Sequence, residues 1–174
     1  MDKTLVIFAK QGRAANQTVV DILAKLSVEE REKERGSYYH SLSGLVVHIV
    51  SALKFFQTLF KEPLASHEKA SAALNILENL SIPQETGTAE QWKQLGEAIL
   101  VADNALVTLI ESLSDEDLKR AVPWFKGNPA TVPLSYLVES LLLHGTHHRG
   151  QISQILDELK IDNDYSGIST EFLV

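Results

Sequence analysis

The sequence contains no cysteine, and this absence removes several kinds of chemistry from consideration. The chain can form neither disulfides nor thiolate metal sites, and it has no cysteine nucleophile. Any metal site must therefore be built from nitrogen and oxygen ligands. A chain without cysteine is also compatible with a reducing compartment such as the cytosol.

The sequence also lacks runs of basic residues and long runs of apolar ones. Its 16 Lys and Arg are outnumbered by 23 Asp and Glu, which gives a net charge of −7. Nucleic-acid binding needs clustered positive charge, so we expect no nucleic-acid partner. We find no stretch close to the ~18–20 apolar residues of a membrane span, and the run from Leu5 to Ala9 is too short for the core of a signal peptide. We therefore predict a cytoplasmic protein with no membrane partner.

The alternation of polar and apolar residues that is typical of strands is nearly absent, and helical periodicity takes its place. The chain has 174 residues, of which 44% are apolar, enough for one domain with a substantial core. We predict a single all-α domain over residues 1–174. Long helices are expected at 2–26, 41–62, 89–113 and 134–159, with an extra short helix at 66–80 that has Ser66 as its N-cap. Proline and glycine mark connections at 81–88 and 114–133, the second of which includes Gly127, Asn128 and Pro129.

Residues spaced three and four apart define the helix faces that should point inward. The inward stripe of the first helix is Leu5, Phe8, Ala9, Gly12, Asn16, Val19, Leu23 and Leu26. The second helix has Leu45, His48, Ala52, Phe55 and Leu59, and the last has Leu137, Leu141, His144, His148, Ile152, Ile155 and Leu159. Acidic residues of the long helices lie mostly off these stripes, so no general base is evident.

Three histidines share these inward faces. His144 and His148 are four residues apart, which places their rings one turn apart on one side of a helix, where both can bind the same ion. His48 interrupts the stripe of the second helix in the same way. Buried imidazoles cost free energy unless their nitrogens find partners, and bundle cores are where facing helices assemble metal sites. We predict that these three residues bind a divalent metal ion; the alternative is three separate, hydrogen-bonded core histidines.

Other polar residues lie in or beside this pattern. His147 flanks the pair on the last helix and is expected to support the site or lie at the surface. Gln151 is either a hydrogen-bonding partner of a ligand or a packed amide. Asn16 could face the metal, but a helix–helix hydrogen bond is favoured. His40 and His67 lie on polar sequence and are expected to be solvated.

The string HGTHHRGQ at residues 144–151, together with His48 on an earlier helix, resembles the DinB/YfiT-like superfamily of metal-binding proteins, which is unrelated to the DNA polymerase of the same name. The resemblance covers almost the whole chain in helix order and length. It implies an up-down-down-up four-helix bundle, a homodimer, and a nickel- or zinc-type ion held by His48, His144 and His148. Members include thiol-dependent transferases and isomerases that use low-molecular-weight bacterial thiols. The extra helix at 66–80 and the end after Leu159 depart from the family pattern, which leaves the substrate open.

Three protein ligands leave a coordination position for water or substrate, as catalytic sites do. A bound ion could lower the pKa of water toward ~7, giving a hydrolase, or polarise a thiol for transfer. Without cysteine in the chain, that thiol would be an exogenous small molecule. We therefore predict a metal-dependent enzyme, either a thiol-dependent transferase or a hydrolase. The alternatives are a non-catalytic metal-binding bundle with a closed site and a helical interaction protein whose histidines are core residues.

Overall fold

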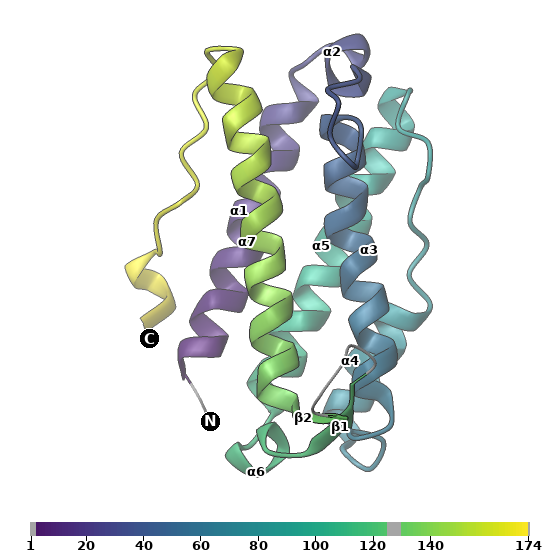
Figure 1. The fold of residues 1–174 in the computed structure, drawn as a ribbon, viewed down its shortest axis with the longest axis vertical. Helices are drawn as coiled ribbons and strands as arrows, with labels where there is room; N and C mark the ends of the chain where they lie inside the picture. The colour runs from purple at the N-terminus through teal and green to yellow at the C-terminus, as the bar shows by residue number, and fades with distance from the viewer. Residues whose placement is uncertain (1–2, 125–129, 174) are drawn as a thin grey trace.

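The computed structural model describes residues 3–124 and 130–173, and its main feature is a four-helix bundle (Figure 1). The long helices are α1 (Lys3–Ala24), α3 (Leu42–Lys61), α5 (Ala89–Ser112) and α7 (Leu134–Glu158). In Figure 1, α1 and α7 run upward and α3 and α5 run downward. The predicted all-α, up-down-down-up bundle is therefore confirmed, and the ends of the long helices differ from the predicted ones by at most two residues.

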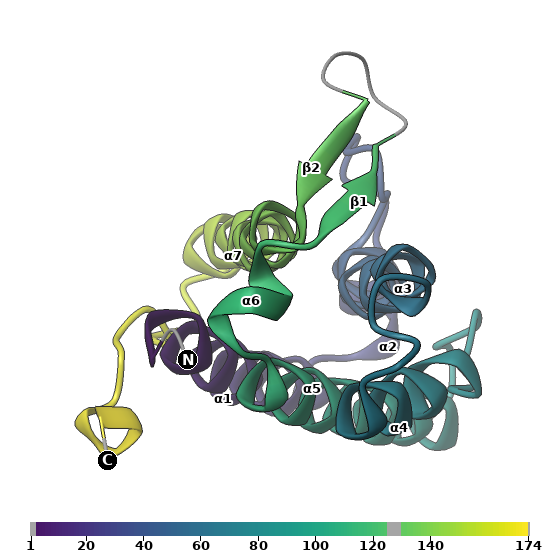
Figure 2. The ribbon, with the colours of Figure 1, turned by 90° about the horizontal axis from the view of Figure 1, so that it is seen from below.

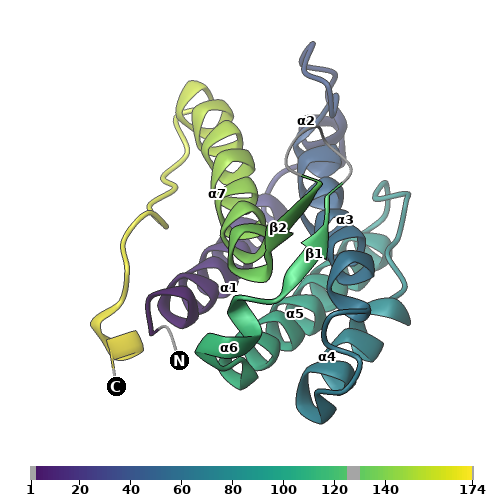
Figure 3. The same cartoon turned by 60° about the horizontal axis from the view of Figure 1, so that its bottom comes forward.

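The parallel pair α3 and α5 requires a long return of the chain. The short helix α4 (Glu68–Glu78) packs against α5 and α3, which confirms the extra helix. Residues 79–88 then run back along the bundle to the start of α5 (Figures 1 and 3). Thr88 and Gln91 form a capping box there, which satisfies backbone donors of the first turn. The connection therefore sets the direction of α5 by spanning the bundle length.

The N-cap of α4 is His67, so the prediction of Ser66 at that position was wrong. The His67 Nδ1 accepts a hydrogen bond from the Ala70 N–H at 3.2 Å, and its Nε2 lies 3.1 Å from the carbonyl oxygen of Ser112. Its side chain is only 21% exposed, so the expectation of a solvated His67 was also wrong. The ring joins the start of α4 to the end of α5, a contact between elements that local sequence does not reveal.

Small elements complete the chain. They are α2 (Val28–Glu32), α6 (Asp115–Leu118), strands β1 (Ala121–Pro123) and β2 (Thr131–Pro133), and the 3₁₀ helix η1 (Thr170–Leu173). The antiparallel hairpin replaces part of the irregular connection expected at 114–133, with Val122 opposite Val132 and both buried. Figure 2 shows it projecting from the lower end of the bundle between α3 and α7. The predicted turn residues Gly127, Asn128 and Pro129 lie outside the described residues.

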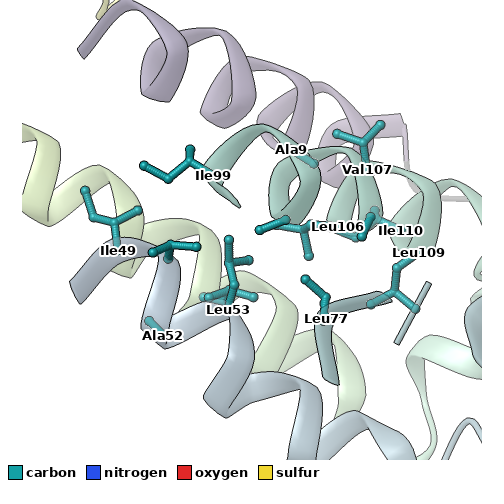
Figure 4. Close-up of a cluster of buried hydrophobic side chains, with 14 of the residues drawn as sticks. Ala9, Ile49, Ala52, Leu53, Leu77, Ile99, Leu106, Val107, Leu109 and Ile110 are labelled. Carbon is teal, nitrogen blue, oxygen red and sulfur yellow. The ribbon is translucent and has the colours of Figure 1, made fainter. Parts of the chain in front are cut away.

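The core is formed by apolar side chains from all of the long helices and α4 (Figure 4). Ile49 and Leu53 of α3 lie in the same cluster as Leu106 and Ile110 of α5. Two aromatic residues that were predicted to point inward do not: Phe8 is 46% exposed and Phe55 48% exposed. They lie at the edges of their helices' apolar arcs, where periodicity alone does not locate the boundary of burial.

Among the described residues, α3 is the one helix long and apolar enough to cross a membrane, with a mean hydropathy of 1.5 over its best window. The expectation that no such stretch exists was therefore too strict. Half of that window is buried, and α3 packs against α4, α5 and α7. Core helices of bundles pass the same test, so the finding is weak evidence for a membrane span.

Candidate metal centre

The three predicted ligands converge between the neighbouring antiparallel helices α3 and α7. His48 comes from the second turn of α3, and His144 and His148 come from successive turns of α7. The Nε2 atom of His144 lies 3.0 Å from that of His48 and 3.1 Å from that of His148. The ligand atoms of all three residues lie within 4.8 Å of one another. The structure thus brings together every residue of the predicted site.

These separations fit the donor set of one ion. Nitrogen ligands about 2.0–2.1 Å from a metal, at angles of about 90–109°, lie about 2.8–3.4 Å apart. Both distances from the His144 Nε2 atom fall in this range. Imidazole donors suit zinc, nickel, copper and iron, so the donor chemistry does not select one metal. The three histidines could therefore hold a divalent ion.

The electrostatics favour the neutral form of the rings, which is the form that binds metal. Burial, with the nearby His148 and His144, lowers the pKa of His48 to about 4. Burial is also the largest cause that lowers the pKa values of His144 and His148. Each ring therefore keeps a lone pair available at neutral pH.

Gln151 orients one of these rings. Its Oε1 atom lies 2.8 Å from the His148 Nδ1 atom. An amide oxygen only accepts hydrogen bonds, so the Nδ1–H donates and the lone pair of the ring lies on Nε2, toward the other histidines. Of the two roles considered for Gln151, the structure shows hydrogen bonding to a candidate ligand. His147 lies outside the trio, with its exposed ring 5.0 Å from that of His148.

Tyr39 is a residue of the site that the sequence analysis missed. Its ring stacks on His48 with the centroids 3.7 Å apart and the planes 19° from parallel. It also meets the His148 ring edge-on, with a centroid distance of 5.2 Å. Tyr39 lies in the turn before α3, where helical periodicity carries no information about its direction.

A buried polar network lies behind His144 and joins α1, α5 and α7. The Asn16 amide donates to both carboxylate oxygens of Asp103 at 3.1 and 3.0 Å, which confirms the helix–helix hydrogen bond expected for Asn16. The Arg149 Nη1 atom donates to Asn16 Oδ1 at 3.0 Å. Asn16, Asp103, His144 and Arg149 also line one cavity of about 30 Å³.

Asp103 departs from the rule that acidic residues lie off the inward faces, because it is 5% exposed. Burial raises the pKa of its carboxyl group to about 6, against the opposing effects of Asn16 and Arg149. Burial also lowers the pKa of Arg149. Asp103 occupies an inward position beside Ala102 and Leu106, and a lone acidic residue on an apolar face is the signal that could have revealed it.

A groove of about 640 Å³ lies beside Gln151, and its lining includes none of the three candidate ligands. One wall is the segment before α3, with Arg35 and Ser37, and the other is α7, with His147 and Gln151. Gln151 belongs both to this groove and to the hydrogen bond that orients His148. The site therefore lies next to a space large enough for a small molecule.

Comparison with known proteins is consistent with this arrangement. The profile of the DinB family matches residues 1–159. A crystal structure of a DinB-like protein from Bacillus subtilis, YjoA, superposes with a TM-score of 0.56 at 19% sequence identity, covering 91% of this chain and 94% of that chain. At this identity the similarity shows the fold alone. No curated protein matches the chain significantly.

Proposed function

The chain belongs to the DinB family. On that premise we propose that it binds a divalent metal ion through His48, His144 and His148. We also propose that it is an enzyme whose activity depends on this ion. The observation that carries the proposal is the convergence of the three rings, with the His144 Nε2 atom 3.0 Å from that of His48 and 3.1 Å from that of His148, separations that suit ligands of one ion. Nickel and zinc are the proposed ions, since imidazole ligands suit both.

Two features favour catalysis over a closed structural site. In the described chain, the cluster able to hold an ion consists of three histidines and no carboxylate, and catalytic zinc sites use three protein ligands where structural sites use four. The groove beside Gln151 offers room for a substrate. When bound, the ion would activate a water molecule or polarise a thiol. The histidines would hold it, Gln151 would orient His148, and the groove would bind the substrate.

The proposed reaction is either transfer from a low-molecular-weight thiol to an electrophile or hydrolysis of a small molecule. The thiol must come from outside the chain, because the chain has no cysteine. A non-catalytic metal-binding role is the second candidate, and one observation favours it: the trio contains no carboxylate that could act as a general base.

Metal binding is tested with untagged protein, so that no histidine tag contributes ligands. We expect about one ion per chain by metal analysis, and high-affinity Zn²⁺ or Ni²⁺ uptake by the chelator-treated protein. His48→Ala and His144→Ala should each lose most of this binding, because two ligands rarely retain such an ion tightly. His147→Ala is the matched control and should bind like the parent. Stoichiometric metal in both ligand variants would refute the assignment.

Catalysis is tested separately with the loaded protein. Bacterial thiols paired with electrophiles probe transfer, and small esters and amides probe hydrolysis. Turnover that disappears with a chelator and in His144→Ala would support the enzyme. Tight metal binding without turnover of any of these substrates would favour the non-catalytic candidate.

We also propose that the protein is a homodimer in the cytoplasm without a nucleic-acid partner. Exposed apolar residues on α1 and α7 support self-association: Phe8 is 46% exposed, Leu143 is 70% exposed, and both line a groove of about 400 Å³. The net charge of −7 supports the lack of nucleic-acid binding. Sedimentation equilibrium should give twice the chain mass of 19.3 kDa, and a monomer throughout the micromolar range would contradict the dimer.

A further inference from the structure

We propose that Tyr39 is a positioning residue of the metal centre, whose ring holds the His48 imidazole with its Nε2 directed toward the ion. This inference rests on the proposed metal binding and deepens it. It assigns a role to the turn between α2 and α3, which supplies none of the three candidate ligands.

His148 of α7 and His48 of α3 are oriented by different means. On α7, the Nδ1 atom of His148 is hydrogen-bonded to Gln151 at 2.8 Å. On α3, His48 makes one hydrogen bond within the described residues, through Nε2, so its Nδ1 atom has no comparable partner. Tyr39 instead covers the flat face of the His48 ring, with a centroid distance of 3.7 Å. Ligating histidines need a fixed ring orientation, and a stacked aromatic ring restricts rotation about the side-chain bonds as a hydrogen bond does.

Tyr39 also connects the two halves of the site. The edge-on contact with His148 has an interplanar angle of 86°, while the stack on His48 has one of 19°. One side chain therefore contacts a candidate ligand from α3 and another from α7. A ligand set held in this way needs less rearrangement when the ion binds.

The turn that carries Tyr39 is held by several specific interactions. Gly36 and His40 both have positive φ, 68° and 63°. The Glu34 carboxylate accepts a hydrogen bond from the Gly36 N–H at 2.7 Å and lies 2.7 Å from the His40 Nδ1 atom. The Arg35 N–H donates to the His40 carbonyl at 2.8 Å. A non-glycine residue at positive φ is costly, and it persists where its surroundings require that conformation.

Gly44 allows this turn to lie against the first turn of α3. A Cβ atom at position 44 would lie 2.0 Å from the Tyr39 carbonyl oxygen and 3.2 Å from its carbonyl carbon. Both are backbone atoms, which a side-chain rotation cannot move away. The Ser41 N–H donates to the same carbonyl at 2.7 Å, and the Ser41 Oγ accepts from the Gly44 N–H as the N-cap of α3. Gly44 lies one helical turn before His48 on α3. Its lack of a side chain allows the Tyr39 backbone to lie close to the helix, where the Tyr39 ring stacks on His48.

The first test compares Zn²⁺ affinity, by competition with a chromophoric chelator, in full-length variants. Tyr39→Ala should bind about 10–100-fold more weakly than the parent, the usual loss when a ligand-orienting group is removed. Tyr39→Phe should stay close to the parent because the ring remains. Tyr38→Ala is the matched control, since Tyr38 is the adjacent tyrosine and is 86% exposed. Parent-like affinity in Tyr39→Ala would overturn the inference.

Gly44→Ala provides a second, indirect variant. It touches none of the three histidines, yet it should weaken Zn²⁺ binding as Tyr39→Ala does, because the added Cβ displaces the Tyr39 backbone. Gly87→Ala is its control: a Cβ there meets nothing within 4 Å. Circular dichroism and thermal unfolding of each variant show whether the bundle is intact. An intact Gly44→Ala protein with parent-like Zn²⁺ affinity would count against the role of this turn.

Spectroscopy separates positioning from a general loss of stability. With Co²⁺ as the probe, Tyr39→Ala and Gly44→Ala should show altered ligand-field bands, whereas Tyr39→Phe should reproduce those of the parent. In the metal-free chain, NMR should show the His48 ring protons shifted upfield by the Tyr39 ring in the parent and in Tyr38→Ala but not in Tyr39→Ala. Failure of the parent to bind Zn²⁺ would refute the proposed function, while identical His48 proton shifts in parent and Tyr39→Ala would refute the inference itself.

Discussion

The amide oxygen of Gln151 and the Nδ1 atom of His148 are 2.8 Å apart, on the side of the ring that faces away from the other two histidines. One helical turn therefore supplies both a candidate ligand and the group that selects its tautomer. The hydrogen bond directs the lone pair of His148 toward His144 and makes the Nε2 atom a stronger electron-pair donor to a metal ion.

Gln151→Ala should consequently weaken Zn²⁺ binding by about 10–100-fold while leaving the bundle folded. The competition assay with a chromophoric chelator measures the change. Gln154→Ala is the control, because Gln154 donates a hydrogen bond to Glu158 on the exposed face of the same helix. Equal affinities for the Gln151 and Gln154 variants would show that the hydrogen bond does not support the ion.

Metal should raise the melting temperature, because the ion binds the folded chain and not the unfolded one. Protons compete for the same nitrogens, but burial lowers the pKa values of the three histidines, that of His48 to about 4. The gain should therefore be full at pH 7.5 and persist below the ordinary histidine pKa of about 6.5, and it should disappear as the pH approaches 4. Thermal unfolding with and without a chelator checks this, and equal melting temperatures at pH 7.5 in loaded protein would contradict it.

In the metal-free protein, His48 should make the bundle less stable in acid. Its unfolded form takes up a proton below pH about 6.5, whereas the folded form does so only near pH 4, so the unfolded state binds more protons between these values. The free energy of unfolding should fall as the pH is lowered through this window. His48→Gln, which cannot titrate, should lose less stability than the parent between pH 6.5 and 4.5 in urea unfolding. An unchanged slope would contradict the shift.

Asp103 should act in the opposite direction. Burial raises its pKa to about 6 from an ordinary value of 3.8, so the folded state binds more protons between these two pH values. Its contribution to stability therefore increases as the pH falls from 6 to 4 and is lost as the pH rises through 6. As the pH falls from 6 to 4, the free energy of unfolding of the parent should therefore increase relative to that of Asp103→Asn. A constant difference in urea unfolding would show that Asp103 does not titrate there.

Gly145 and Gly150 of α7 should respond differently to alanine. A Cβ at Gly145 would lie 3.1 Å from the Arg149 Nη1 atom, and moving that atom would disturb its hydrogen bond to Asn16. A Cβ at Gly150 meets nothing within 4 Å. Gly150→Ala should therefore stabilise the protein by about 0.5–1 kcal/mol, whereas Gly145→Ala should destabilise it by about 1–3 kcal/mol through the buried bond. Similar unfolding free energies for the two variants would refute the tight fit around Arg149.

Helical periodicity was sufficient to predict the long helices and the inward histidines. The four-residue spacing of His144 and His148 determines that their rings share a face, whatever surrounds the helix. The position of His48 in an apolar stripe likewise indicates its direction. These features depend on backbone geometry repeated along one helix, which is why they can be recognised before the structure is known.

The remaining features depend on contacts between segments that are distant in the chain or on the path of a turn. The stacking of Tyr39 requires two residues at positive φ and close approach to Gly44. The burial of Asp103 depends on Asn16, 87 residues away, and the position of His67 depends on Ser112. Periodicity gives the angle of a residue around its own helix, but the packing of neighbouring helices decides which angles are buried and which polar groups meet. For this reason the candidate ligands were predictable, whereas the residues that hold and surround them became visible only in the folded bundle.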